Sequence, residues 1–309
     1  MCTLMKRLFF LLCLGIFLTS CKEETALKVA TFNIRYQNEA DASRGNGWED
    51  RCPVICGLLR YERPDIFGSQ EVLVDQLHDM LQELPDYDYV GVGRDDGVDE
   101  GEHEPIFWRR DRFSLLDKGW FWLSETPEKP GLGWDAACVR ICTWAHLKDK
   151  ESGKRIWFFN LHMDHVGVVA RAESAKLIVS RIESMCQPSE YVFVTGDFNV
   201  DQNNEIYSTF TQSAVLTDSY ETTADRYAPN GTFNGFDPNS FTRSRIDHIF
   251  VSPTVQVNNY AVRTDTYRKS LDLDETYRVG DFPAEVSFER YIAKTPSDHF
   301  PVFIKVQLK

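Results

Sequence analysis

The chain has 309 residues, of which 42% are hydrophobic and 13% are aromatic, and its formal net charge is −13. This composition excludes a disordered or fibrous protein and suits one large globular domain or two small ones. A protein that binds a long nucleic acid normally presents a basic face, so the acidic charge makes duplex nucleic acid an unexpected partner. A small or single-stranded phosphorylated ligand, held by a local basic cluster, is compatible with this charge.

The N-terminal segment has the pattern of an export signal. Lys6 and Arg7 precede an apolar run over 8–18, and the letters LTSC follow, ending at Cys21. This run is too short to span a bilayer, so residues 1–20 are predicted to be a cleaved signal peptide. The small residues before Cys21 resemble the lipobox of bacterial lipoproteins, in which the new N-terminal cysteine carries the lipid. An ordinary signal peptide followed by a chance cysteine is the alternative.

Lys22, Glu23 and Glu24 follow Cys21 directly and resemble the short signal that sends Bacteroidetes lipoproteins to the cell surface. We therefore expect an exported lipoprotein anchored in the bacterial outer membrane, at the cell surface or alternatively facing the periplasm. Residues 21–27 would form a short lipid-anchored linker, and residues 28–309 would form the domain. The N-terminal lipid would be the only contact with the membrane.

Interleaved strands and helices are predicted over the rest of the chain from apolar periodicity, with Pro64 ending the first helix. In chain order, the predicted elements are strand 27–35, helix 48–64, strand 65–71, helix 72–84, strands 105–109, 113–118, 139–147 and 155–162, helix 169–186, a strand that begins at 191 and stops at Gly196, and strands 245–252 and 300–308. Gly91–Gly97 is expected to be an acidic surface loop. The polar segments 221–245 and 264–296 are expected to be long loops, which are often functional.

The cysteine count argues against a disulfide framework. Three of the eight cysteines lie within the first 21 residues, which leaves an odd number in the domain. Cys52 with Cys56 and Cys138 with Cys142 recur at a spacing of four, which does not match a zinc site. These residues are therefore predicted to be buried thiols.

Polar side chains stand at or just beyond the ends of the apolar runs. Rigid scaffolds present chemistry at strand ends, and neighbouring strands would bring these side chains into one cleft. The residues in this position are Asn33, Glu71, His162, Asp197, Asn199, Asp247, Asp298 and His299.

Three of these residues, Asn33, Glu71 and Asp298, offer oxygen donors without a cysteine among them. Hard oxygen donors are preferred by Mg²⁺ or Mn²⁺, and a magnesium site needs only one or two carboxylates besides a substrate phosphate. Asp197 and Asn199 would project beside this group if the chain stays extended between them. The sequence therefore predicts a divalent metal beside a second polar pair.

Asp298 and His299 are adjacent, so on an extended segment their side chains point to different sides and can serve different roles. Asp247, in the letters RIDH, is a candidate for the contact that fixes the tautomer of this histidine. His299 could then neutralise charge on a phosphoryl oxygen.

Six short motifs, TFNIR, SQEV, NLHMD, GDFNV, RIDHIF and SDHFPV, resemble those of the endonuclease/exonuclease/phosphatase superfamily, in the same order, from about residue 28 to 308. That superfamily includes DNase I, abasic-site endonucleases, inositol polyphosphate 5-phosphatases, bacterial sphingomyelinases and carbon-catabolite-repressor-type deadenylases. The resemblance implies a four-layer α/β sandwich, in which two mainly antiparallel sheets pack face to face with helices on both outer faces. It also implies a Mg²⁺- or Mn²⁺-dependent hydrolase that cleaves a phosphodiester or phosphomonoester by in-line attack of water.

The resemblance also implies roles for the metal and water ligands. Glu71 would be the principal metal ligand, assisted by Asn33 and Asp298. Asp197 would orient or deprotonate the attacking water, and Asn199 would steady the nucleophile and the transition state.

A second set of residues would contact the phosphate. His299, paired with Asp247, and His162 occupy positions where the superfamily places such contacts. The segments WDAACVRICTWAHL and HMDHVGVVARAESAK resemble a bacterial subgroup near the deadenylase branch, which makes Arg140 and Arg171 candidate substrate ligands. A structural role for either arginine is the alternative.

One position departs from the superfamily pattern. Several nuclease members carry an aspartate two residues after the asparagine of the first motif, as an additional metal ligand, whereas this chain has Arg35 there. A second tightly held metal is therefore not expected. Alternatively, Arg35 simply forms a salt bridge with a neighbouring carboxylate.

Other polar residues are given structural roles. His165 and His248 are expected to be structural neighbours of the site, and Glu102 and Glu104 to lie at the cleft entrance without binding metal. Four aromatic residues could either form a stacking platform or pack in the core, namely Trp48, Trp134, Phe236 and Phe241.

Two other classes of function compete with the phosphoesterase. A binding lipoprotein could keep the fold without catalysis, but it would require a damaged site. A glycoside hydrolase could use Glu71 with Asp197 as paired carboxylates, but it would leave the asparagines and the Asp-His pairs unexplained.

Overall fold

The computed structural model describes residues 25–271, 276–277, 281, 283 and 285–309. The predicted signal peptide and Cys21 lie outside these residues. Strand β1 begins at Thr25, so the last three residues of the predicted 21–27 linker belong to the sheet instead. They do so because Thr25 pairs with Leu308 of the last strand. No helix within the described ranges combines the length and apolar character that a membrane span requires.

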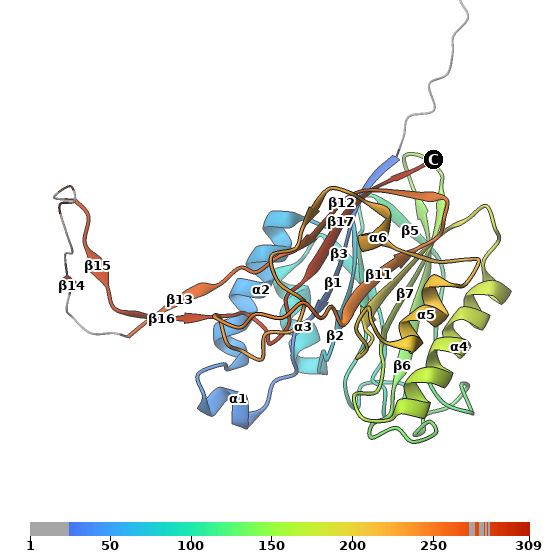
Figure 1. Cartoon of the computed structure of the whole chain (residues 1–309), viewed down its shortest axis with the longest axis horizontal. Coiled ribbons are helices and arrows are strands. Elements are labelled where there is room, and N and C mark those ends of the chain that lie inside the picture. Colours follow the sequence, from blue (N-terminus) through green and yellow to red (C-terminus); the bar gives the residue numbers. More distant parts are fainter. Residues whose placement is uncertain (1–24, 272–275, 278–280, 282, 284) are drawn as a thin grey trace, which may run out of the picture.

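Two sheets form the centre of the molecule (Figure 1). The seven-stranded sheet has the order β10 (Arg226–Tyr227), β12 (Val255–Val262), β17 (Val302–Leu308), β1 (Thr25–Asn33), β2 (Ile66–Gln70), β4 (Ile106–Arg109) and β3 (Tyr87–Val90). The six-stranded sheet has the order β5 (Phe113–Trp122), β6 (Ile141–Asp149), β7 (Arg155–His162), β8 (Tyr191–Asp197), β11 (Asp247–Val251) and β9 (Thr217–Asp218). Most neighbouring strands are antiparallel, and the exceptions are β1 with β2, β7 with β8 and β10 with β12.

Three apolar clusters separate four layers. The largest lies between the sheets and includes Val29 of β1 and Phe193 of β8. A second joins the seven-stranded sheet to α2 (Trp48–Glu62) and α3 (Val74–Glu83), and a third joins the six-stranded sheet to α4 (Val168–Met185) and α5 (Glu205–Thr211). The short helices α1 (Glu39–Ser43) and α6 (Ser219–Thr222) lie in connections. The predicted four-layer α/β sandwich is confirmed.

A buried polar network crosses the apolar core and fixes the two sheets to each other. Asn160 of β7 accepts a hydrogen bond from Gln70 Nε2 at 2.6 Å and donates to the Ser69 carbonyl at 2.7 Å. Thr195 of β8 donates to the same Asn160 oxygen at 3.0 Å. Gly68 makes this approach possible, because a Cβ there would stand 2.2 Å from Asn160 Oδ1. The network therefore sets the relative position of strands whose ends carry the candidate site.

The sequence patterns missed several elements. Strand β3 has only four residues, and β12 is interrupted at Asn259, where the pairing register shifts. The predicted 264–296 loop contains paired strands, namely β13 (Tyr267–Ser270) with β16 (Tyr291–Lys294) and β14 (Thr276–Tyr277) with β15 (Phe288–Glu289). These hairpin strands project from the body as an arm (Figure 1). The 221–245 segment matches its prediction more closely, with only the end of α6 and the two-residue β10 in regular structure.

Candidate active site

The polar strand ends gather at one end of the sandwich. β7 and β8 are parallel with His162 opposite Asp197, and β11 places Asp247 opposite Asp197 on its other side. These ends border a cleft of about 600 Å³. The cleft is lined by Arg35, Tyr36, Glu71, Arg94, Glu102, Cys138, Arg140, His162, His165, Asp197, Asn199, Phe233, Ile246, Asp298 and His299. The structure thus brings together the predicted residues, with Asn33 and Asp247 directly behind this lining.

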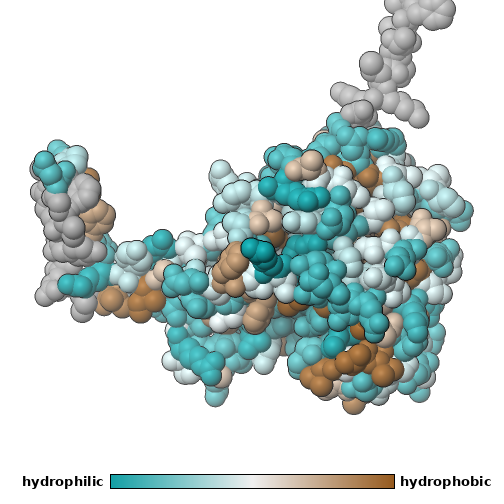
Figure 2. Space-filling model, in the orientation of Figure 1, coloured by the Kyte–Doolittle hydropathy of each residue, from teal (hydrophilic) through white to brown (hydrophobic). Residues whose placement is uncertain are grey.

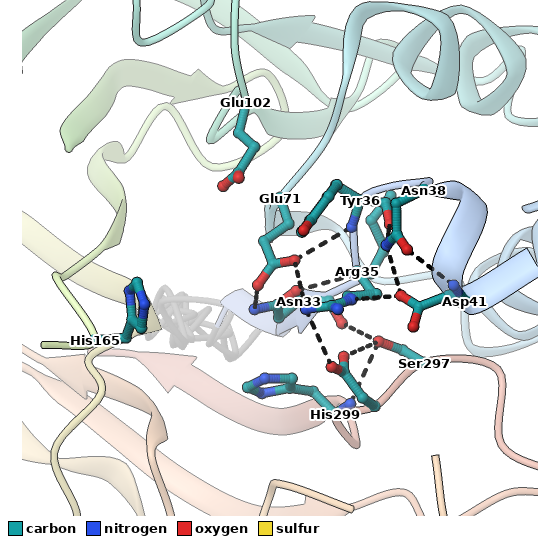
Figure 3. Close-up of polar contacts among 12 residues, drawn as sticks. Asn33, Arg35, Tyr36, Asn38, Asp41, Glu71, Glu102, His165, Ser297 and His299 are labelled. Carbon is teal, nitrogen blue, oxygen red and sulfur yellow. Dashed lines mark hydrogen bonds and ion pairs between the residues drawn. The ribbon is translucent and has the colours of Figure 1, made fainter. Parts of the chain in front are cut away.

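Asn33 connects the two sheets at the floor of the cleft (Figure 3). Its Nδ2 donates to Glu71 Oε1 at 3.0 Å and to Asp197 Oδ2 at 3.1 Å, while its Oδ1 accepts the Arg35 backbone N–H at 3.0 Å. The oriented amide therefore offers N–H groups to the acids. The Asn33 oxygen keeps a second lone pair, so its ligation of a metal stays a prediction.

The turn after β1 is held by a buried arginine that no sequence pattern predicts. Arg51 of α2 is fully buried and donates to four backbone carbonyls, including those of Ile34 at 2.6 Å, Arg35 at 3.0 Å and Pro296 at 3.2 Å. Gln76 also donates to the Arg35 carbonyl, at 3.1 Å. Buried carbonyls need such partners, so these contacts tie the first and last motifs together.

Asp197 lies at the centre of the site. Its Oδ1 accepts the Asn199 backbone N–H at 2.9 Å, and its Oδ2 stands 3.4 Å from His162 Nε2 and 3.6 Å from His299 Nε2. Burial and the nearby Asp247 carboxylate raise the pKa of Asp197 to about 7. A carboxylate with a pKa near neutral pH is suited to accept a proton from water.

His299 and Asp247 form the predicted pair. His299 Nδ1 is 2.9 Å from Asp247 Oδ2, and both residues are buried. Burial alone would lower the pKa of His299, but the carboxylates of Asp247 and Asp197 raise it by more. The pKa of His299 therefore lies well above its usual value. His299 is therefore held as a cation in the cleft.

His162 has the opposite protonation preference. Burial and the Arg140 guanidinium lower the pKa of His162 well below its usual value, so the ring is neutral. Its Nε2 lies 3.1 Å from Asn199 Nδ2 and accepts that amide hydrogen. Its Nδ1 lies 3.9 Å from both Glu102 Oε2 and Glu104 Oε1.

Glu104 does not lie at the cleft entrance, where the sequence analysis places it. It is fully buried behind His162, and neither carboxylate oxygen has a hydrogen-bond partner within the described ranges. Burial raises the pKa of Glu104 well above its usual value. Glu102 does line the cleft and forms an ion pair with Arg94 at 2.5 Å.

The two candidate substrate arginines differ in position. Arg140 is buried and lines the cleft, and its Nε and Nη1 make no hydrogen bond in the described part of the chain, although Nε lies 3.6 Å from Asp164. Arg171 does not line the cleft and donates instead to the Asp164 carbonyl at 2.9 Å. Arg140 therefore lies in the cleft, and Arg171 has the position that the structural alternative predicts.

The oxygen donors fit a divalent cation. Glu71 and Asp298 both line the cleft, and the Arg35 guanidinium stands between them, 3.8 Å from Glu71 Oε2 and 3.6 Å from Asp298 Oδ2. Burial raises the pKa of Asp298, so a cation beside this carboxylate would offset a cost of keeping it ionised. The donors are carboxylates, the ligands that Mg²⁺ and Mn²⁺ prefer.

Several residues that line the cleft were not predicted to be site residues. Tyr36 and Phe233 are the aromatic residues that face the cleft, and His165 lines it beside Arg140, with its Nδ1 3.1 Å from Arg140 Nη2. None of the four aromatic residues proposed as a platform lines the cleft, and Trp48 is buried against α3 through a hydrogen bond to Asp79. His248 is buried and bonded to the Val200 carbonyl, as predicted for a structural neighbour.

The described cysteines are all free. Cys52, Cys56 and Cys142 are buried, as predicted, whereas Cys138 is only partly buried because it lies on the cleft wall.

The chain matches the model of the Endonuclease/Exonuclease/phosphatase family over residues 30–299. Among solved structures, a mannosyl-6-phosphatase from Bacteroides thetaiotaomicron is 52% identical, with 91% of this chain and 99% of that chain covered and a TM-score of 0.83. A family member from the same organism is 50% identical, with 93% and 99% covered and a TM-score of 0.85. A third, from Bacteroides vulgatus, is 38% identical, with 92% and 100% covered and a TM-score of 0.78.

The protein belongs to the endonuclease/exonuclease/phosphatase family, since the matched region, residues 30–299, covers most of the chain and contains every residue that lines the cleft. It is therefore a member of a family of hydrolases that act on phosphate ester bonds.

Proposed function

We propose that the protein is a Mg²⁺- or Mn²⁺-dependent phosphoesterase whose substrate is a small sugar phosphate. The observation that carries this proposal is the meeting of Asp197, Asn199 and His299 beside Glu71 in one cleft. The 52% identity with a mannosyl-6-phosphatase favours a phosphomonoester on a sugar over a nucleic acid backbone.

In the proposed reaction, Asp197 orients a water molecule and accepts its proton as the water oxygen attacks phosphorus in line with the leaving oxygen. The pKa of Asp197, about 7, suits this role at neutral pH. Asn199 is fixed for the task, because its side-chain amide donates to the Met163 carbonyl at 2.9 Å and faces His162. A metal held by Glu71 and Asp298 would polarise the phosphoryl group and offset its developing charge.

Two cationic groups complement the phosphoryl oxygens. His299 has its ring fixed by Asp247, and two guanidinium nitrogens of Arg140, Nε and Nη1, make no hydrogen bond among the described residues, although Nε lies 3.6 Å from Asp164. Preorganised donors in a buried site stabilise charge more than they would in water, because they need no reorganisation during the reaction.

The body of the substrate would extend over the rim of the cleft. Beside His165, the loop before α4 and the start of that helix expose apolar side chains, with Val166 60% and Val168 58% exposed. Most of the face in Figure 2 is hydrophilic, and a compact apolar patch stands out near the lower end of α4. Exposed patches of this kind often mark binding surfaces, so a sugar or its aglycone could rest there.

The test is hydrolysis by the purified mature chain, followed as inorganic phosphate from mannose 6-phosphate and as p-nitrophenolate from p-nitrophenyl phosphate and bis-p-nitrophenyl phosphate. We expect hydrolysis that EDTA abolishes and Mn²⁺ or Mg²⁺ restores, and a loss of about a thousandfold in kcat for Asp197→Asn and for His299→Gln. Absence of turnover with every metal and substrate would instead favour the binding lipoprotein. Metal-independent release of p-nitrophenol from a p-nitrophenyl glycoside would favour the glycoside hydrolase.

We further propose that the enzyme is an exported lipoprotein attached through Cys21, and that its cleft opens away from the membrane. β1 begins at Thr25 beside the end of β17 and reaches Asn33 at the cleft, so the attachment end and the active site lie at opposite ends of one strand (Figure 1). Only three residues separate Cys21 from Thr25. Radiolabelled palmitate incorporation that is lost in Cys21→Ser would support the attachment, and equal labelling of both chains would contradict it.

A further inference from the structure

Arg35 occupies an unusual position between the carboxylates of the proposed metal site. Its Nη1 lies 3.8 Å from Glu71 Oε2 and 3.6 Å from Asp298 Oδ2, and its Nε donates to Asp41 Oδ2 at 2.8 Å. Figure 3 shows the Arg35 side chain among Glu71, Asp41 and His299. The arginine therefore contacts an acid on each side while it lines the cleft.

The backbone of Arg35 is strained and held in place. Its φ is +59°, in the left-handed region that residues other than glycine seldom adopt. The N–H of Arg35 donates to Asn33 Oδ1 at 3.0 Å, and its carbonyl accepts from Arg51 and Gln76. Every polar group of the backbone at this residue thus has a buried partner, which fixes the direction of the side chain.

The side chain is anchored as firmly. Asp41 is buried at the start of the short helix α1, and it also accepts a hydrogen bond from Asn38 Nδ2 at 2.6 Å. Asn38 in turn accepts the Asp41 backbone N–H at 2.8 Å. Asp41 therefore holds the Nε edge of the Arg35 guanidinium, which leaves Nη1 directed toward Glu71 and Asp298.

We propose that Arg35 is a positioning residue that acts as a fixed cation and limits the site to one divalent metal ion. This inference rests on the proposed metal-dependent function. Glu71 and Asp298 supply two negative charges, which one divalent ion balances. A second divalent ion on the Arg35 side of these acids would meet the guanidinium at short range, where like charges repel strongly. The first ion would still be bound by the carboxylates of Glu71 and Asp298, and two carboxylates are enough for a hydrated Mg²⁺.

The experiment is a titration of the mature metal-free chain with Mn²⁺, in which free Mn²⁺ is measured by electron paramagnetic resonance without any substrate. Wild type is expected to bind one Mn²⁺ at the site. Arg35→Gln removes the cation and is expected to tighten Mn²⁺ binding at least about tenfold. Arg35→Asp adds an oxygen donor at a residue type that tolerates positive φ, and it is expected to bind a second Mn²⁺.

Two further variants separate charge from folding. Arg35→Lys keeps the charge and should bind a single Mn²⁺ with nearly wild-type affinity. Asp41→Asn leaves Glu71 and Asp298 intact but loosens Arg35, and it should bind Mn²⁺ with an affinity between those of wild type and Arg35→Gln. Thermal melts identify any variant that fails to fold.

Two Mn²⁺ ions at the wild-type site, or unchanged stoichiometry and affinity in folded Arg35→Gln and Arg35→Asp, would overturn the proposal for Arg35 while leaving the metal-dependent function intact. No Mn²⁺ binding in wild type or any variant would overturn the proposed metal dependence itself.

Discussion

Asp197 and Asp247 lie directly opposite each other on β8 and β11, yet their environments give them different partners. Asp247 holds His299 Nδ1 at 2.9 Å, whereas Asp197 faces the cleft with His162 and His299 at 3.4 and 3.6 Å. Two neighbouring acids in different environments are a common way to divide roles in catalysis. We therefore expect Asp247 to orient His299 and Asp197 to act on water.

This division predicts the effect of Asp247→Asn. The substitution removes one of the carboxylate charges that raise the pKa of His299 while keeping the shape of the side chain, so the pKa of His299 should fall and kcat should fall about a hundredfold or more. The readouts are steady-state kinetics and an NMR titration of the His299 ring. An unchanged His299 pKa together with unchanged kcat would contradict the orienting role.

The two arginines provide a matched pair. Arg140→Ala should lower kcat/KM about a hundredfold, because a buried cation that faces the cleft is lost. Arg171→Ala should leave kcat/KM within about threefold of wild type, since Arg171 contacts a backbone carbonyl outside the cleft. Comparable losses of kcat/KM in both variants would show that a position in the cleft does not distinguish the roles of the two arginines.

The network beneath the site predicts that Gly68→Ala is destabilising. The new Cβ would stand 2.2 Å from Asn160 Oδ1 and 2.4 Å from Thr195 Oγ1, so the sheets must move apart. Overpacking of this kind costs about 1–3 kcal/mol, and we expect the free energy of unfolding in urea to fall by at least the upper value. Gly131→Ala is the control, because nothing lies within 4 Å of a Cβ there. Equal stability of the two variants would refute the steric account.

Buried Glu104 predicts a pH-dependent stability. Burial raises its pKa in the folded state, so the folded protein binds this proton more tightly than the unfolded chain does. The pH-dependent cost of burying it is therefore absent below the unfolded pKa near 4.5 and grows as pH rises above it, by at most about 1.4 kcal/mol for each pH unit. Glu104→Gln should raise the melting temperature more at pH 8 than at pH 5. A pH-independent difference would show that Glu104 is ionised in the folded protein.

The sequence predicted the strand-end residues well, because the change from an apolar run to a polar side chain is a local signal. Asn33, Glu71, Asp197 and His299 were all found in this way, and the structure places them together. The pairing of His299 with Asp247 was also predicted from local motifs.

What the sequence did not reveal depends on contacts between distant segments. Arg51 resembles any helix arginine until its carbonyl partners, up to 245 residues away, are known. Glu104 and Gly68 likewise acquire meaning only from what packs against them. The paired strands of the 264–296 segment were missed because they are short, and the residues of β13 and β16 are all at least partly exposed, so no buried face marks them.

The most direct test of the central claim follows the oxygen of the attacking water. Hydrolysis of mannose 6-phosphate with Mn²⁺ in ¹⁸O-labelled water should place one ¹⁸O in the released inorganic phosphate and none on C6 of mannose, because the water activated by Asp197 attacks phosphorus. Incorporation of the label at the C6 oxygen, or phosphate release that persists unchanged in Asp197→Asn, would contradict the account.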